Sequence, residues 1–276
     1  MGQEAPVSST QPVPPPDHAW LSTVYCSGFY TNQKISDDLR LVSGEQSKYK
    51  ITFTARDIVY LSKGANQGVR EGARFSVVRE TKDPSPVLWF KWQEKLTRAM
   101  GSHYADLGQL EVIKVQPNIA IAKVSMSCNL MQRGDIVLPF SERPAGPFKD
   151  ASAFDFLAPA SGKPVAMVVR ARDTSQMYGR WDSVYVNLGT SQGAKVGDYF
   201  RIFRHQGSRS ETVPTEKDYQ DRMYGFGSNP KHYTWNDLPR EVLGEGIVLN
   251  ASQNSATVLV TIAKAEIHAG DYVELE

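Results

Sequence analysis

The chain has 276 residues, enough for one or two domains that each bury a core. Its 31 basic residues nearly balance its 30 acidic residues, so no overall charge directs it toward nucleic acid or an anionic membrane. No apolar run approaches the roughly 20 residues that cross a bilayer, and no transmembrane segment is expected. Composition therefore excludes these partners without indicating an activity.

Residues 1–19 are polar and rich in proline, which predicts a disordered or polyproline-like tail. The start lacks the basic and apolar regions of a signal peptide. We interpret Gln3–Asp17 as the start of a mature periplasmic or exported protein, with Met1-Gly2 as a cloning remnant; a cytosolic tail is the other interpretation. In an oxidising compartment Cys26 and Cys128 could form a disulfide, and otherwise both would be small buried hydrophobic residues.

Residues 20–140 are predicted to form a first β domain. Trp20–Thr31 is rich in aromatic and β-branched residues, and apolar residues alternate with polar ones over 49–54, so both segments are expected to be strands. Ile58–Leu61 and Phe75–Val78 are further strands, joined by a glycine-punctuated turn. Leu107–Val124 is typical of a hairpin, and a last strand follows at 134–138.

The most convincing helix lies between Pro84 and Asp106, and it ends at Gly101. Its apolar residues recur at helical spacing; they are Leu88, Trp89, Trp92, Leu96 and Met100. We expect this face to cap the open end of a barrel; the other hypothesis is a helix that binds a partner, with Trp89 and Trp92 as contacts.

Residues 141–163 contain several prolines and glycines and are predicted to be a linker, of which 153–157 could pack against a domain. The second β domain is expected to span 164–276. Its first strand, Pro164–Arg170, is predicted to correspond to the segment near Gly28. Later strands are expected at 246–250, 256–262 and 271–275, after an enlarged 206–240 loop whose aromatic content favours function over plain disorder.

The two predicted domains share a pattern that indicates internal duplication. Nine residues of Asp57–Arg79 recur 125 positions later in Asp182–Arg204, and residues of the closing segment recur 136 positions later. The shared glycines are Gly64, Gly68 and Gly72 in the first copy and Gly189, Gly193 and Gly197 in the second. A strand follows each set and no Lys-Ser closes a phosphate loop, so we interpret them as structural turns.

This repeated pattern begins with Asp-x-Val-Tyr, three glycines four residues apart, Phe and Arg. Leu-Gly, a hairpin and Gly-Asp follow later in each copy. The pattern resembles a bacterial envelope module. It is similar to the C-terminal domain of flagellar assembly protein T and to repeats that follow LysM modules. The first copy has Ala73 where the second has Asp198, and the other domains of those families are missing from this chain. The resemblance implies a small antiparallel barrel used for assembly or attachment.

The sequence therefore predicts a mainly β protein of two tandem SH3/OB-like antiparallel barrels, with a short helix in the first. No histidine or cysteine spacing indicates a metal, and we expect no cofactor and no catalytic site. The leading hypothesis is a non-enzymatic envelope scaffold that binds other envelope proteins or further copies of itself. The alternative is a peptidoglycan-binding module. Its expected contacts are Tyr219, Tyr224, Phe226, His232, Tyr233 and Trp235.

Two smaller hypotheses concern residues within the repeats. Asp57 and Asp182 occupy equivalent positions before strands, which favours a turn or capping role over catalysis. Tyr60 and Tyr185 alternate with apolar residues, which favours packing in the core or at the rim of a barrel over contact with a ligand.

Overall fold

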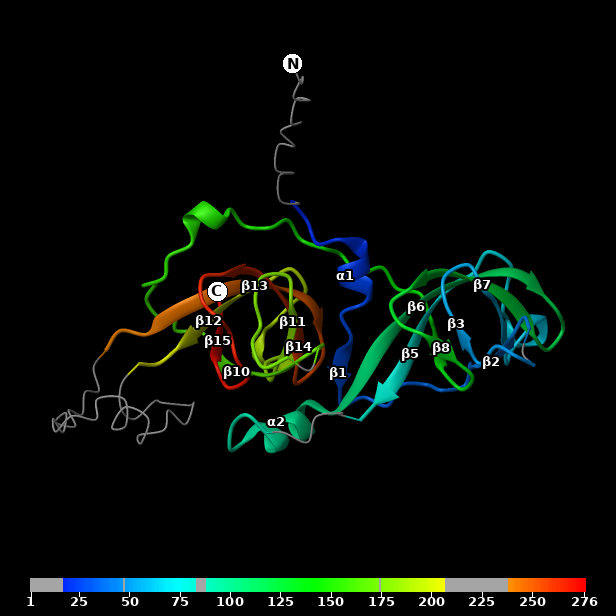
Figure 1. Ribbon diagram of the computed structural model, residues 1–276, viewed down its shortest axis with the longest axis horizontal. Helices are drawn as coiled ribbons and strands as arrows, with labels where there is room; N and C mark the ends of the chain where they lie inside the picture. The colour runs from blue at the N-terminus through cyan, green and yellow to red at the C-terminus, as the bar shows by residue number, and fades with distance from the viewer. Residues whose placement is uncertain (1–16, 47, 83–87, 174, 207–237) are drawn as a thin grey trace, which may run out of the picture.

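The computed structural model describes residues 17–46, 48–82, 88–173, 175–206 and 238–276. The protein is mainly β, and its strands gather into two bodies that lie on either side of a short segment near the N-terminus (Figure 1). We call these bodies the N-terminal sheet and the C-terminal barrel. Within the described residues, no helix is long and apolar enough to cross a membrane.

The C-terminal barrel is closed by six antiparallel strands in the order β10-β11-β14-β13-β12-β15. The strands are β10 (Val165–Ala171), β11 (Ser183–Val186), β12 (Tyr199–Arg204), β13 (Glu241–Ala251), β14 (Ala256–Ala263) and β15 (Tyr272–Leu275). Closure occurs where β10 pairs with β15. Alternate side chains point inward and form the largest core, with Phe200, Ile202 and Val258 fully buried.

The N-terminal sheet has the order β2-β4-β7-β6-β5-β9, and β1 pairs with β6 outside this path. Its strands are β1 (Phe29–Thr31), β2 (Leu41–Gly44), β4 (Ile58–Leu61), β5 (Arg74–Thr81), β6 (Ser102–Val115), β7 (Ala120–Ser127) and β9 (Ile136–Pro139). A small second sheet pairs β3 (Thr52–Phe53) with β8 (Met131–Gln132). The outer strands β2 and β9 approach each other at the bridge between Arg40 and Ile136, and the sheet curls around its own core.

The two glycine-punctuated units fold alike. A 3₁₀ turn follows β4 at η1 (Ala65–Gln67) and follows β11 at η3 (Thr190–Gln192). Gly68 and Gly193 end these turns with φ of 84° and 94°, a left-handed conformation that glycine adopts most readily. An added Cβ on Gly189 would lie 2.2 Å from the carbonyl oxygen of Ser252, so the turn lies directly against the β13–β14 hairpin.

The capping interpretation of the paired aspartates is confirmed. The Asp57 carboxylate accepts a hydrogen bond from the Thr54 amide at 2.7 Å, and Asp182 accepts one from the Gly179 amide at 2.8 Å. Burial alone would raise the pKa of Asp57, but hydrogen bonds from Lys50 and the Thr54 amide outweigh it, so this pKa lies below its ordinary value. Both carboxylates thus close the turn that leads into a strand.

Two predicted strands near the N-terminus are confirmed only in part, at Phe29–Thr31 and Thr52–Phe53. Residues 20–25 form the short helix α1 (Leu21–Tyr25), because Val24 and Tyr25 pack against the C-terminal barrel and this tertiary contact outweighs β propensity. In the segment 49–54 only Thr52 and Phe53 are in a strand; Tyr49 is 91% exposed and its amide bonds to Gln46 in a turn. The segment near Gly28 was expected to correspond to β10, which pairs with β11. In the N-terminal sheet the strand that pairs with β4 is β2, so β2 is the counterpart of β10.

The predicted helix over 84–106 is shorter in the structure, where α2 spans Gln93–Met100. Trp89 and Phe90 precede it and pack against the core of the C-terminal barrel, and the Gln93 side chain accepts a hydrogen bond from the Trp89 amide at 2.6 Å. The helix ends at Gly101, as predicted, and the chain continues at once into β6. The helix therefore covers the neighbouring barrel.

The predicted linker runs along both bodies. Phe148 contacts the ring of Trp181 with a centroid separation of 5.3 Å, and Phe154 packs beside Phe203 of the C-terminal barrel. A single 3₁₀ turn, η2 (Ala151–Ala153), is capped by Asp150, whose carboxylate accepts from the Ser152 amide at 2.9 Å. The segment is thus packed against the fold along much of its length.

Candidate functional site

The predicted site residues fall into two groups. Six of them lie in 207–237, outside the described residues; these are Tyr219, Tyr224, Phe226, His232, Tyr233 and Trp235. Of the other two, Trp89 packs on the C-terminal barrel, whereas Trp92 is 58% exposed. The described residues that gather in space instead lie where the N-terminal sheet meets the barrel.

Helix α2 and strand β1 form this junction from the N-terminal side. Gln93 donates from Nε2 to the Val169 carbonyl of β10 at 2.8 Å. Thr257 of β14 donates from its hydroxyl to the Gly28 carbonyl, just before β1, at 2.9 Å. Ser255 likewise donates to the Tyr30 carbonyl at 3.0 Å. Strand β1 therefore pairs with β6 on one side and is bonded to the barrel on the other.

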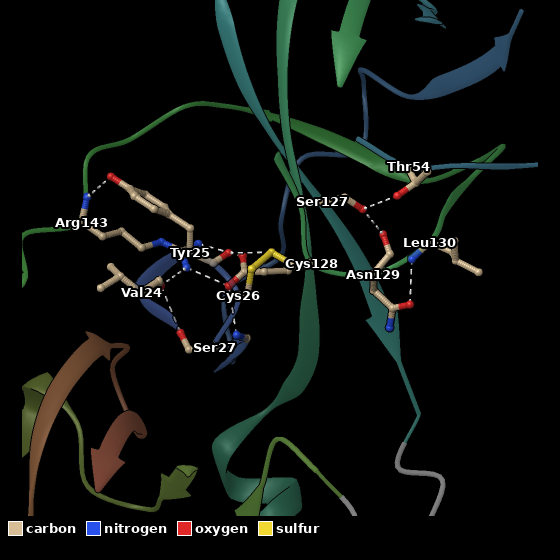
Figure 2. The surroundings of a disulfide bond; sticks show 12 residues. Val24, Tyr25, Cys26, Ser27, Thr54, Ser127, Cys128, Asn129, Leu130 and Arg143 are labelled. Atoms are coloured by element: carbon tan, nitrogen blue, oxygen red, sulfur yellow. Dashed lines mark hydrogen bonds and ion pairs between the residues drawn. A yellow bond between two sulfur atoms is a disulfide. The ribbon is translucent and has the colours of Figure 1, made fainter. Parts of the chain in front are cut away.

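A disulfide fixes the N-terminal segment to the sheet (Figure 2), and a buried ion pair lies beside it. Cys26 follows α1 and is bonded to Cys128, which follows β7, with a Cα–Cα distance of 5.3 Å. Beside it Arg143 of the linker binds both carboxylate oxygens of Asp106, at 2.7 and 2.9 Å. Asp106 also accepts a hydrogen bond from the Gly28 amide at 2.9 Å. The carboxylate is thus buried but satisfied.

Tyr185 of β11 lies at the centre of the junction. It is fully buried, and its hydroxyl donates to the Ser27 carbonyl at 2.8 Å. The same oxygen lies 2.9 Å from Nε2 of His103, and Nδ1 of His103 lies 2.5 Å from the Thr81 hydroxyl. Because Tyr185 donates its only proton to Ser27, the bond to His103 is donated by Nε2. The ring of Tyr30 packs edge-on against Tyr185, with centroids 5.1 Å apart.

This hydrogen-bond chain orders the junction. Burial raises the pKa of the Tyr185 phenol far above its ordinary value, so the group stays protonated and acts as a hydrogen-bond donor. The chain runs from the Thr81 hydroxyl through His103 and Tyr185 to the main-chain carbonyl of Ser27. Among the described residues, no group of three His, Cys, Asp or Glu side chains is placed to hold a metal ion.

A second polar cluster lies on the outer face of the C-terminal barrel. The Glu274 carboxylate accepts from Arg240 at 2.6 Å and from Arg201 at 3.2 Å. Burial alone would raise the pKa of Glu274, but hydrogen bonds from Arg240 and the Ser161 amide outweigh it and hold the pKa below its ordinary value. The carboxylate stays ionised and paired, which indicates a structural ion pair.

A cavity of about 370 Å³ opens at the junction beside Tyr185 and His103. Its walls come from β5 and β6 of the sheet, from α2, and from β10 with the loop that follows it. The sequence offers no motif that singles out His103 or Arg170. Only the buried Asp106, next to apolar strand residues, could have signalled a polar junction.

The junction joins the two β bodies through side chains of both. Its buried polar groups are engaged in holding the two bodies together, and its cavity is shared by both. Comparison of the sequence with models of known protein families and with curated proteins gave no match, so the function is argued from this geometry and from the sequence pattern.

Proposed function

We propose that this protein is a non-enzymatic scaffold of the bacterial cell envelope that attaches other envelope proteins. The observation that carries the proposal is the buried junction, where a disulfide, the Asp106–Arg143 pair and Tyr185 connect the two β bodies. A protein that fixes two bodies in one orientation is suited to hold partners at a defined distance. The exposed loops and the surface of α2 would then supply the contacts.

We also infer that the two bodies are tandem barrels that arose by internal duplication, with the first barrel in 20–140 and the second in 164–276. Repeated contacts support this inference. Arg79 binds Asp135 at 2.7 and 2.9 Å, and Arg204 binds Asp271 at 2.7 and 2.8 Å in the matching position. Gln67 and Gln192 each accept a hydrogen bond at 2.9 Å from the glycine that begins their turn.

The proposed location is the periplasm or another exported compartment. The Cys26–Cys128 disulfide supports it, because such bonds persist in oxidising compartments and are rare in the cytosol. The resemblance to flagellar assembly protein T and to repeats associated with LysM modules supplies the cell-envelope context. It is a sequence argument, and it adds the expectation of protein partners.

The test compares two kinds of binding by the oxidised full chain. In one arm the protein is cross-linked in envelope extracts and its captured partners are identified; in the other it is sedimented with purified peptidoglycan. We expect saturable capture of specific envelope proteins and no enrichment on peptidoglycan. Retention on peptidoglycan that is lost when Tyr224, Phe226, Tyr233 and Trp235 become alanine would replace the scaffold proposal with the glycan-binding alternative.

A matched pair of variants checks the role of the junction. Tyr185→Phe loosens the contact between the two bodies, whereas Tyr60→Phe makes the same change at the equivalent place in the other repeat, away from the junction. If the fixed orientation matters, Tyr185→Phe should reduce capture of partners and Tyr60→Phe should not. Equal capture by both variants would remove the structural basis of the proposal.

A further inference from the structure

Side chains of both bodies line the cavity at the junction. Thr81, Lys82 and His103 line it from the β5–β6 arm, and Arg170 and Arg172 line it from the barrel. Its volume of about 370 Å³ lies within the range of ligand sites, near the lower end. Side chains on several of its walls also make hydrogen bonds within the junction: Gln93 donates to the Val169 carbonyl at 2.8 Å, and Arg170 donates from Nε to the Thr97 hydroxyl at 3.2 Å.

Positive charge dominates the lining. Lys82, Arg170 and Arg172 contribute cations, and Asp173 is the one acid among the described lining residues. Arg172 lies 3.0 Å from Asp173, but both side chains are exposed, and such a pair contributes little to stability and is easily exchanged for another partner. The guanidinium groups favour a carboxylate, which a planar fork of N–H donors can bind through two hydrogen bonds.

Aromatic side chains lie beside these cations. Trp89 from the segment before α2 and Tyr178 from the barrel line the same cavity, and both also pack against the barrel core. Trp89 therefore offers a ring surface held in place by packing, which suits an apolar or aromatic side chain. A small inorganic anion would leave this surface unused. The lining fits a carboxylate attached to an apolar group.

We propose that the junction cavity binds an acidic peptide segment of a partner protein, with its carboxylate on Arg170 and Arg172 and a neighbouring apolar side chain on Trp89. The inference rests on the proposed scaffold function, since it assigns that function a docking site. It also links docking to the junction, because the two arginines belong to the barrel whereas Lys82 and Trp89 belong to the N-terminal half. The site exists only while the two bodies are packed together.

The experiment uses two blocked tetrapeptides, Phe-Glu-Leu-Glu and Phe-Gln-Leu-Gln, titrated into the isotope-labelled full chain and followed by amide and indole NMR shifts. The acidic peptide should shift signals of Trp89, Gln93 and Arg170, and the glutamine peptide should bind at least about tenfold more weakly. Inorganic phosphate at equal concentration should not reproduce these shifts.

Variants then locate the site. Lys82→Ser with Arg172→Ser removes two exposed cations from the lining, whereas Lys123→Ser removes an exposed lysine of β7 that does not line the cavity. The double variant should weaken the acidic peptide about tenfold or more, and the control should change its affinity less than about twofold. Rising salt should weaken binding to the unmodified chain, since the attraction is partly screened.

Four outcomes would overturn the proposal: no binding of the acidic peptide at millimolar concentration, equal binding of the glutamine peptide, shifts remote from the cavity, or an unchanged affinity in the double variant. The capture of envelope proteins uses neither peptide, so it decides the scaffold proposal separately. Capture that persists in the Lys82→Ser and Arg172→Ser double variant would leave the scaffold standing and place its docking surface elsewhere.

Discussion

Replacing Tyr185 with phenylalanine removes a single hydroxyl from the centre of the junction. That hydroxyl donates to the Ser27 carbonyl at 2.8 Å and accepts from His103 at 2.9 Å. Each hydrogen bond contributes about 1 kcal/mol net, and a buried group left without its partner costs about 1–3 kcal/mol. Because Ser27 is fully buried, we expect Tyr185→Phe to lower the free energy of unfolding by about 2–3 kcal/mol.

The similar sequence pattern around Tyr60 supplies a matched control for this prediction. Tyr60 occupies the equivalent place in β4, but it is only half-buried, and its hydroxyl makes no hydrogen bond to the part of the chain that the structure describes. Tyr60→Phe should therefore change stability by less than about 0.5 kcal/mol. Urea unfolding followed by tryptophan fluorescence measures both variants. Equal losses of unfolding free energy in the two variants would refute the conclusion that the Tyr185 hydroxyl holds the two bodies together.

Three further predictions concern the fold. Replacing Cys26 and Cys128 with serine opens a loop with a sequence separation of 102 and should cost about 4–5 kcal/mol, measured by urea unfolding. Gly189→Ala forces a Cβ against a carbonyl oxygen 2.2 Å away and should cost about 1–3 kcal/mol in the same assay. The pKa of Glu274 is held below its ordinary value of 4.5. The ionised carboxylate therefore contributes its full stability above that pH, and this contribution is lost as the pH falls through the folded-state pKa. Glu274→Gln should flatten this dependence of stability on acid pH.

Each of these has its own control. Reduction of the unmodified chain should match the serine variant, and reducing agent should leave that variant unchanged. Gly179→Ala places a Cβ in open space and should stay within about 0.5 kcal/mol of the parent. A Glu274→Gln chain whose stability still falls with pH as steeply as the parent would show that other carboxylates govern the acid limb.

Much of the β architecture could be predicted from the sequence. Strand β4 spans Ile58–Leu61 as predicted, and the β6–β7 hairpin turns at Gln116-Pro-Asn118. These features are local: a half-buried strand needs period-two alternation, and a tight turn needs a residue that tolerates its backbone angles. The end of α2 at Gly101 was predictable for the same reason.

The errors share a different cause. The segment that became α1 has strand-like composition, and it is helical because Val24 and Tyr25 must fit against a barrel more than 140 residues later in the chain. Trp89 and Phe90 were expected inside a helix, but they extend from its start onto the same barrel. Neither contact can be seen in the spacing of apolar residues. That spacing indicates that one face of an element is buried, but it does not indicate which body covers the face.

Tyr60 and Tyr185 show that similar local sequence does not determine how deeply a side chain is buried. Ile-Val-Tyr-Leu around Tyr60 and Ser-Val-Tyr-Val around Tyr185 are nearly the same local pattern, and both form the predicted strand. Only the tertiary structure buries Tyr185 under β1 and bonds it to Ser27 and His103, while Tyr60 stays half-exposed. The sequence by itself determined strands and turns, because these depend on neighbouring residues. The junction and its cavity were decided by the packing of surfaces far apart in the chain.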